Sequence, residues 1–334
     1  MKYQSNNRIK FISFIKKNFF HRLWIENIYF RVLIHEYDIK LVYNFSGTAQ
    51  FFMPVPQLIK LQNLMFFSKA LDITYLNRRN YTLWVKQIFL KRLVLLVMYK
   101  NKIYFEVQSC HVANSFLNFH TNRSTKFYIK SDIDVARKSF LPVKKYNFSE
   151  KISFLYIVGP HFEMTHKNLQ DFIEAMLLLL EANVLFEIII TLSQEKLEQS
   201  PLWDPRLSAL TRFTGYLPGE QVSALFSNNT LLISTSIVET VGLHVIEAIQ
   251  SGIIPLVPEA EYSRSVYGQN VQTYTLFNPK SLVDTINQIR QWTQQQSERH
   301  ISTLQSDLLQ NETNKYNKIT DVFETIQRVA TNNV

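Results

Sequence analysis

The chain contains little cysteine, glycine and proline for its length. Its 334 residues include 1 Cys, 7 Gly and 10 Pro. The single cysteine, Cys110, excludes a disulfide within the chain and a zinc site made of several thiolates, and it favours a reducing compartment. So few Gly and Pro residues exclude collagen-like and low-complexity proteins. With 46% hydrophobic and 19% charged residues, the chain has the composition of a protein with a folded core.

A long hydrophobic run is also missing. The longest apolar stretches, near 93–99 and 175–180, are much shorter than the ~20 residues that a membrane-spanning helix needs. The N-terminus is rich in Lys and Asn and has no small-residue cleavage site, so we expect no secretory signal. These features predict a cytoplasmic protein, soluble or bound peripherally to the inner face of the plasma membrane.

Acidic residues are scarce in the first half of the chain. Residues 1–150 hold 24 Lys and Arg against 8 Asp and Glu, a net charge of +16. Residues 151–334 hold 12 against 19, a net charge of −7, which gives +9 for the whole chain. This difference predicts a domain boundary near residue 150, with the polar segment 143–151 as the linker.

The basic half is also rich in aromatic residues, and this combination has three interpretations. It is typical of a surface that binds nucleic acid through phosphate contacts and stacking. It is also typical of a protein that lies on an anionic membrane. The third interpretation is a solvated basic face over an aromatic core. Because no DNA or RNA recognition motif is present, we expect no nucleic-acid partner.

Hydrophobic spacing predicts the order of helices and strands. In the first half, helices are expected over 9–34 and 80–98, and short strands within 39–45, 57–67, 103–109 and 126–129. In the second half, strands are expected at 152–158, 185–191, 211–215, 231–235 and 253–257, and helices at 168–181, 218–228, 242–251, 279–292 and 302–330. This alternation predicts an α/β protein with a doubly wound parallel sheet.

Two glutamates and a glycine follow the strand predicted at 231–235, on the side of the sheet where ligands bind. Glu239 lies in the loop, Gly242 stands where the next helix begins, and Glu247 falls in the second turn of that helix. Without a side chain at Gly242, a ligand can approach the first N–H groups of the helix, and the helix dipole favours an anion there. The Glu247 carboxylate can accept two hydrogen bonds from a pair of sugar hydroxyls. The alternative is a capped amphipathic helix with two surface glutamates.

A lysine follows the strand predicted at 152–158. Lys167 stands at a helix start, where a cation opposes the helix dipole at a cost of a few tenths of a kcal/mol. An anion bound between the cation and the helix would explain this position, and an ordinary surface lysine is the alternative. Thr165 or Asn168 is suited to cap the helix. His161 and His166 have no acidic partner at ligand spacing, so we expect no metal site. Cys110 and His111 are expected to point to opposite faces of a strand, with Cys110 in a structural role.

Several motifs resemble family 4 glycosyltransferases of the GT-B fold, of the type that builds bacterial O-antigen or capsule. They are T-H-K-N at 165–168, T-G-Y-L-P at 214–218 and E-T-V-G-L-H-V-I-E-A at 239–248. Weaker similarity extends through R-L-W-I-E at 22–26, V-P-Q at 55–57 and V-Q-S at 107–109, followed by a helix. The resemblance covers residues 20–292 and is most specific over 150–292.

The resemblance implies two Rossmann-like doubly wound domains. It assigns 1–145 to a basic N-terminal domain on the acceptor side and 150–292 to a C-terminal domain that binds the nucleotide-sugar. Residues 293–334 are expected to form a C-terminal helix that packs back on the N-terminal domain. The first glycine of the chain is Gly47, and no strand–glycine–helix unit precedes it. We therefore expect the first domain to lack its first βα unit.

The resemblance also implies roles for individual residues. Lys167 would neutralise the donor diphosphate, and Glu239 would contact the transferred sugar, as the catalytic pair. The donor-binding residues would be Gly159, His166, Asn168, Gly242, Leu243 and Glu247. Gln62 and Asn63 would lie on the acceptor side. Charge on the leaving diphosphate would be stabilised by Lys167 and the helix N-terminus, with no metal and no other cofactor.

Two positions depart from the family pattern. The arginine that often follows the first glycine of the second domain is Pro160 here, and the histidine that often precedes Asn63 is Gln62. We expect a glycosyltransferase that moves a sugar, with retention, from a UDP- or GDP-sugar to a polyprenyl-diphosphate-linked sugar at an anionic membrane surface. A non-catalytic nucleotide-sugar-binding or scaffold protein and a nucleic-acid-binding protein are the alternatives.

Overall fold

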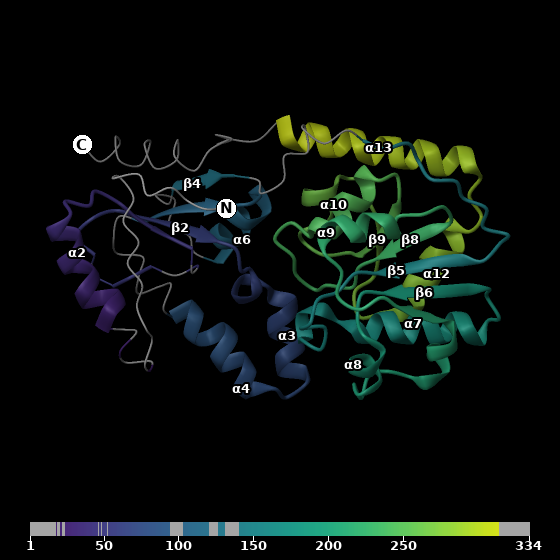
Figure 1. The fold of residues 1–334 in the computed structure, drawn as a ribbon, viewed down its shortest axis with the longest axis horizontal. Helices are drawn as coiled ribbons and strands as arrows, with labels where there is room; N and C mark the ends of the chain where they lie inside the picture. The colour runs from purple at the N-terminus through teal and green to yellow at the C-terminus, as the bar shows by residue number, and fades with distance from the viewer. Residues whose placement is uncertain are drawn as a thin grey trace.

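The chain contains two parallel β-sheets, one in each half (Figure 1). The computed structural model describes residues 18, 21, 24–45, 47, 49–51, 53–93, 103–119, 126–130 and 140–313. The predicted α/β class with parallel, Rossmann-like sheets is confirmed. The part of the predicted N-terminal helix that precedes residue 18 lies outside the described residues, as does the chain beyond residue 313.

The N-terminal sheet has four strands in the order β1-β2-β3-β4, all parallel. Its strands are β1 Val42–Asn44, β2 Gln57–Leu61, β3 Ile103–Val107 and β4 Lys126–Ile129. The helical segments around it are η1 Ile25–Tyr29, α2 Phe30–Glu36, η2 Met65–Phe67, α3 Lys69–Asn77, α4 Tyr81–Trp84, η3 Val85–Phe89 and α6 Cys110–Phe119. Ser68 begins α3 because its side chain accepts a hydrogen bond from the N–H of Leu71.

The C-terminal sheet has six parallel strands in the order β10-β9-β8-β5-β6-β7. Its strands are β5 Ile152–Tyr156, β6 Phe186–Ile190, β7 Thr211–Phe213, β8 Thr230–Ile233, β9 Ile254–Pro258 and β10 Gln272–Tyr274. Strand order reverses between β5 and β8, which are neighbours in the sheet. A crevice at the carboxyl ends of the strands is expected at this point of reversal.

Helical segments connect and cover the C-terminal strands. They are η4 Thr165–Lys167, α7 Leu169–Glu181, α8 Gln194–Glu198, η5 Pro205–Leu210, α9 Gly219–Val222, η6 Ser223–Leu225, α10 Leu243–Gln250, α11 Ser263–Tyr267, α12 Pro279–Ile289 and α13 Gln294–Thr313. One continuous apolar core lies between these helices and the sheet. It forms because β5, β8 and β9 are buried along their whole length, as expected for central parallel strands.

The segment expected to be a linker is part of the C-terminal core. Tyr146 and Phe148 are buried, and the Tyr146 hydroxyl donates to the carbonyl of Thr230 and accepts from the N–H of Ile254. The segment 143–151, predicted as the linker between the domains, is therefore packed against the C-terminal sheet. The polar composition of the segment gave no sign that Tyr146 and Phe148 belong to the C-terminal core.

The last described helix packs on the C-terminal half. Along the upper edge of Figure 1, α13 lies beside α10, and Ile301, Leu304 and Leu308 join the C-terminal core. In its described part, 294–313, the helix does not follow the expectation that it packs back on the N-terminal domain. It also begins eight residues earlier than predicted, since its first turns are polar and carry no apolar spacing.

The two halves contact each other through apolar side chains. Ile237 and Val238, from the loop after β8, join the core of the N-terminal sheet. The Ser109 hydroxyl also donates to the carbonyl of Thr240, with an oxygen–oxygen distance of 3.1 Å. The carboxyl ends of both sheets therefore face a shared cleft.

Candidate active site

Two loops that the sequence singles out meet at the carboxyl end of the C-terminal sheet. The first follows β5 and the second follows β8, and these strands are neighbours. The Thr235 hydroxyl donates to the carbonyl of Lys167 at 2.8 Å, and the N–H of Ile237 donates to the carbonyl of His166 at 2.8 Å. These bonds hold η4 against the second loop and place the side chains of both loops in one site.

An ion pair between Lys167 and Glu239 joins the two loops. The Lys167 Nζ lies 2.7 Å from the Glu239 Oε1, and the two side chains are 27% and 15% exposed. Burial alone would raise the pKa of Glu239, but the charge and hydrogen bond of Lys167 favour its ionised form and lower the pKa below its ordinary value. The site therefore holds a partly buried cation next to an ionised carboxylate.

Gly242 begins α10 in the left-handed conformation, with φ at 60°. A Cβ at this position would lie 2.0 Å from the hydroxyl oxygen of the buried Tyr267, so no other residue fits without a shift. The next residue, Leu243, is 46% exposed at the first turn of the helix. The first N–H groups of a helix have no partner within it, so this end of α10 is suited to an anion.

Glu247 lies in the second turn of α10, as predicted from the sequence. It is partly buried, and its carboxylate forms no hydrogen bond with any residue that the structure describes. A carboxylate in this state can accept two hydrogen bonds from a ligand. It thus differs from Glu239, whose carboxylate already binds Lys167.

A first cavity of about 230 Å³, the donor cavity, lies between the carboxyl ends of β5 and β6 and the loop after β7. Its lining residues are Ile157, Val158, Gly159, Lys167, Thr191, Tyr216, Leu217, Val222 and His244. Gly159 is open to it, since a Cβ there would meet nothing within 4 Å. The sequence motif T-G-Y-L-P contains Tyr216, whose side chain is 81% exposed, but spacing alone did not assign it to the site.

A second cavity of about 210 Å³, the central cavity, lies between the two sheets. Its lining residues are Gln62, Asn63, Leu64, Met65, His166, Val238, Glu239 and Thr240. Gln62 and Asn63, predicted on the acceptor side, therefore face Glu239 and His166 across the cleft. The Asn63 Oδ1 accepts a hydrogen bond from the N–H of Met65 at 2.9 Å, which holds this wall in place.

The ion pair stands between the two cavities, because Lys167 lines the donor cavity and Glu239 lines the central one. His166, next to Lys167, has a buried Nδ1 without a hydrogen-bond partner among the described residues. Burial and the neighbouring Lys167 lower the pKa of His166 to about 4, so its ring is neutral at neutral pH. The positive charge at this point therefore belongs to Lys167.

Asn168 immediately precedes α7, at its N-cap position, but does not cap the helix through its side chain. The residue is buried and left-handed, with φ at 47°, and its side chain accepts no hydrogen bond from the helix. The cap role suggested for Asn168 by its position is therefore wrong. Three residues on, the buried Asp171 carboxylate accepts from the N–H of Phe277 at 2.9 Å and ties α7 to the loop after β10.

A third cavity, of about 150 Å³, was not foreseen from the sequence. His111 and Ser115 from α6 face the loop after β9 across it, together with Leu64 and Val238. Cys110 and His111 begin a helix, so the expectation that they occupy a strand is wrong. The strand ends at Val107, because residues 110–119 carry helical spacing and pack on the core.

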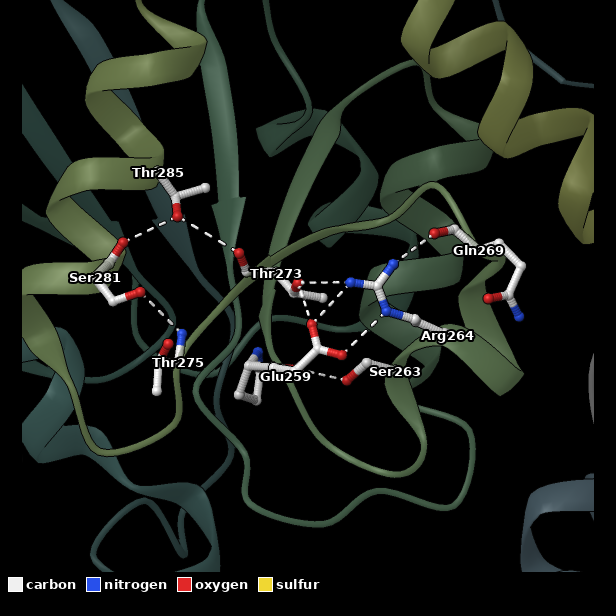
Figure 2. Close-up of polar contacts among 9 residues, drawn as sticks. Glu259, Ser263, Arg264, Gln269, Thr273, Thr275, Ser281 and Thr285 are labelled. Carbon is white, nitrogen blue, oxygen red and sulfur yellow. Dashed lines mark hydrogen bonds and ion pairs between the residues drawn. The ribbon is translucent and has the colours of Figure 1, made fainter.

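A polar network holds the loop after β9 in place (Figure 2). The Glu259 carboxylate accepts hydrogen bonds from the Arg264 Nε at 3.0 Å and Nη2 at 2.9 Å, and another from the Thr273 hydroxyl. Farther along, Thr285 donates to the carbonyl of Ser281 at 2.9 Å. The Glu259 carboxylate on the wall of the third cavity is thus occupied by protein groups.

Possible metal ligands do not gather anywhere in the described part of the chain. No group of three or more His, Cys, Asp or Glu side chains has the geometry to hold a metal ion there. Lys167 and the N-terminus of α10 supply positive charge at the carboxyl ends of β5 and β8.

Comparison with known proteins gives a family match for part of the chain. Residues 143–303 match the family model of glycosyl transferases group 1. The comparison with curated protein sequences gives no match.

Solved structures of glycosyltransferases have the same fold. Sucrose-phosphate synthase from Thermosynechococcus elongatus aligns with a TM-score of 0.55 and 12% identity, over 85% of this chain and 75% of that one. Anabaena HepE, solved with UDP and glucose, aligns with a TM-score of 0.55 and 16% identity, over 90% and 80%. TarM from S. aureus, solved with UDP, aligns with a TM-score of 0.54 and 14% identity, over 83% of this chain and 51% of TarM, so the chain spans about half of TarM. The family match and the shared GT-B fold support a glycosyltransferase.

Proposed function

We propose that the chain transfers a sugar from a UDP- or GDP-sugar to a lipid-linked oligosaccharide of surface polysaccharide synthesis, such as O-antigen or capsule. The observation that carries the proposal is the ion pair of Lys167 and Glu239 between two cavities, beside the N-terminus of α10. The donor cavity would hold the nucleoside, and the central cavity would hold the transferred sugar. The diphosphate would then lie across Lys167 and Gly242.

Transfer breaks the bond between the anomeric carbon and the diphosphate and forms a bond to an acceptor hydroxyl. Negative charge builds up on the departing diphosphate, where Lys167 and the first N–H groups of α10 would stabilise it. This supply of positive charge supports transfer without a metal. We expect the activity to survive treatment with EDTA, measured as nucleotide release, and a loss restored by added Mg²⁺ or Mn²⁺ would contradict this part.

Each remaining site residue would contribute by position. Glu247 would accept hydrogen bonds from the ribose hydroxyls, and the exposed Tyr216 ring would contact the base. Glu239 would orient Lys167 in the free protein and contact the sugar in the complex. Gln62 and Asn63, on the opposite wall of the central cavity, would contact the reacting sugar or the acceptor, and transfer would retain the anomeric configuration.

Thermal stability with nucleotides is the decisive measurement. A ligand at one hundred times its dissociation constant stabilises the native state by about 2.7 kcal/mol. We expect UDP or GDP, and the matching nucleotide-sugars, to raise the melting temperature of the protein. Lys167→Ala and Glu247→Ala should lose most of this shift, because they remove the diphosphate and ribose contacts.

Lys196→Ala and Glu220→Ala are matched controls, since both residues are exposed on the same half of the chain. They should keep the shift in full. Absence of a shift with every nucleotide would contradict the donor site. A shift without nucleotide release from any UDP- or GDP-sugar, in the presence of a polyprenyl-diphosphate-linked sugar, would instead indicate the non-catalytic nucleotide-sugar-binding protein.

The lipid-linked acceptor places the enzyme at the cytoplasmic face of the membrane. The net charge of +16 over residues 1–150 supports this location, because basic residues near an anionic lipid surface attract it. In the described residues, no helix has both the length and the hydropathy to cross a bilayer. The protein would therefore reach its acceptor from the surface.

A further inference from the structure

The helical hairpin formed by residues 69–93 packs on the N-terminal core through Leu71, Tyr75 and Ile88, and it exposes many other large apolar side chains. In 81–93, α4 and η3 run on as one helical segment. Of that segment only Ile88 is fully buried. The exposed large apolar residues of the hairpin are Ile73, Leu76, Tyr81, Leu83, Val85, Phe89, Leu90 and Leu93, between 36% and 57% exposed. The outer face of a helix in water normally carries polar side chains, so the outer face of this hairpin is unusually apolar.

Inward-facing polar bonds fix this orientation. The Asp72 carboxylate accepts from the Trp84 indole Nε1 at 2.7 Å and pairs with the Arg92 Nη2 at 2.6 Å. The Tyr75 hydroxyl donates to the Gln87 Oε1 at 3.1 Å. These bonds join the second helical segment to α3 and hold its polar residues against the protein. The apolar residues are therefore kept on the outside by specific contacts.

The exposed charged residues of the hairpin are all basic. Residues 69–93 contain six Lys and Arg, and their single acidic residue, Asp72, is occupied by Arg92 and Trp84. Lys69, Arg79 and Lys86 are exposed. Exposed apolar residues interleaved with cations are the composition of a helix that lies in the interface of an anionic bilayer.

We propose that the hairpin 69–93 is the surface by which this protein docks on anionic membranes, with its apolar side chains inserted between the lipid headgroups. Figure 1 shows α3 and α4 together along one edge of the molecule, below the N-terminal strands. Through η2, α3 continues directly from the 62–65 wall of the central cavity. Docking by this edge would place the cleft next to the lipid surface. This orientation rests on the proposed function, in which the acceptor is lipid-linked and must reach the cleft from the membrane.

Vesicle co-sedimentation tests the surface directly. The probes are phosphatidylglycerol vesicles and phosphatidylcholine vesicles. The native protein should bind the first and bind the second weakly. The variant Phe89→Ser/Leu90→Ser/Leu93→Ser removes apolar insertion, and Lys69→Glu/Arg79→Glu/Lys86→Glu reverses the charge. Each should weaken binding to phosphatidylglycerol by at least about tenfold.

Matched controls carry the same changes on the other half of the chain. Leu178→Ser/Leu185→Ser/Leu309→Ser replaces three exposed leucines, and Lys196→Glu/Lys280→Glu/Arg299→Glu makes the same change in net charge. Both controls should bind vesicles as the native protein does. Loss of binding equal to that of the hairpin variants would overturn the proposal, because net charge and general apolarity would then explain it.

Two further measurements separate the outcomes. Thermal stabilisation by UDP and GDP should be the same for the hairpin variants and the native protein, which shows that they are folded. If the native protein binds nucleotide but no vesicles, the hairpin proposal is overturned and the donor site stands. If it binds vesicles but no nucleotide, the donor site is contradicted and the hairpin proposal stands. A native dimer that the serine variant dissociates, measured by analytical ultracentrifugation, would identify the apolar face as a contact with a second copy and also overturn it.

Discussion

The two halves of this chain use charged and apolar residues in opposite ways. In the C-terminal half, the central strands are apolar and fully buried, and the charged groups gather at the carboxyl ends of β5 and β8. In the N-terminal half, Lys60 and Glu106 lie inside the sheet, while the hairpin 69–93 shows apolar side chains to the outside. A sheet whose central strands are apolar and buried holds the loops of a ligand site in place. The exposed apolar side chains of the hairpin 69–93 are instead suited to contact with lipid. Under the two proposals, the first half attaches the protein to the membrane and the second half binds the sugar donor.

The buried pair in the N-terminal sheet offers the largest expected effect. Glu106 is fully buried on β3, and its carboxylate lies 3.9 Å from the Lys60 Nζ on the neighbouring β2 and accepts from the Tyr43 hydroxyl at 2.8 Å. Lys60→Met should lower the free energy of unfolding by about 3–5 kcal/mol, because it leaves an uncompensated buried charge. Urea denaturation measures the loss.

The double variant Lys60→Met/Glu106→Leu is the control for that prediction. It removes both charges together, so most of the lost stability should return. A double variant as unstable as the single one would show that packing around β2 and β3, and not charge, limits this half.

Gly242 tests the rigidity of the C-terminal half. Gly242→Ala should cost about 2–4 kcal/mol, since the new Cβ meets the Tyr267 hydroxyl in a left-handed backbone. It should also weaken nucleotide binding by displacing the first turn of α10. Gly219→Ala, where a Cβ meets nothing within 4 Å, should leave stability nearly unchanged in the same denaturation experiment.

Acid should destabilise both halves through buried histidines. Burial lowers the pKa of His111, His166, His244 and His300 to about 4 from an ordinary value of 6.5. The folded state therefore holds these rings neutral, and its stability is lost as pH falls from about 6.5 towards 4, where the unfolded chain takes up the protons.

His111→Gln isolates one of these groups. The variant should reduce the loss of unfolding free energy between neutral pH and the acid range by at most about 3 kcal/mol, the full value of such a shift. Denaturation curves at several pH values provide the measurement. An unchanged pH dependence would show that folding does not shift the pKa of His111.

Replacing one exposed tyrosine on each half should separate the effect on nucleotide binding from the effect on vesicle binding. Tyr216→Ala should weaken UDP or GDP binding by about tenfold, in the range of one stacking contact, and leave vesicle binding unchanged. Tyr81→Ala should weaken vesicle binding and leave nucleotide binding unchanged. Both residues are more than half exposed, so neither change should affect stability. Nucleotide titration and vesicle co-sedimentation measure both effects for each variant. If either variant weakened both kinds of binding, the two halves would not have separate roles.

Prediction from sequence succeeded where burial has a regular period. The strands β5, β6, β8 and β9 are runs of β-branched and other apolar residues, and each was located within two residues of its ends. It failed for β10, a three-residue strand with the sequence Gln-Thr-Tyr that exists because it pairs with β9. It also missed α3, whose Ile73 and Leu76 face outward and so break the expected spacing.

The candidate site, too, was only partly predictable from the sequence. The sequence alone determined which loops matter, because parallel strands place their carboxyl ends at one edge and Lys167, Glu239, Gly242 and Glu247 follow such ends. Only the tertiary structure decided that Lys167 and Glu239 pair and stand between two cavities, and that Tyr146 belongs to the core. Neither could the sequence show which face of 69–93 is exposed. Spacing along a chain sets local conformation, whereas distances between loops and the outward face of a helix depend on how whole elements pack.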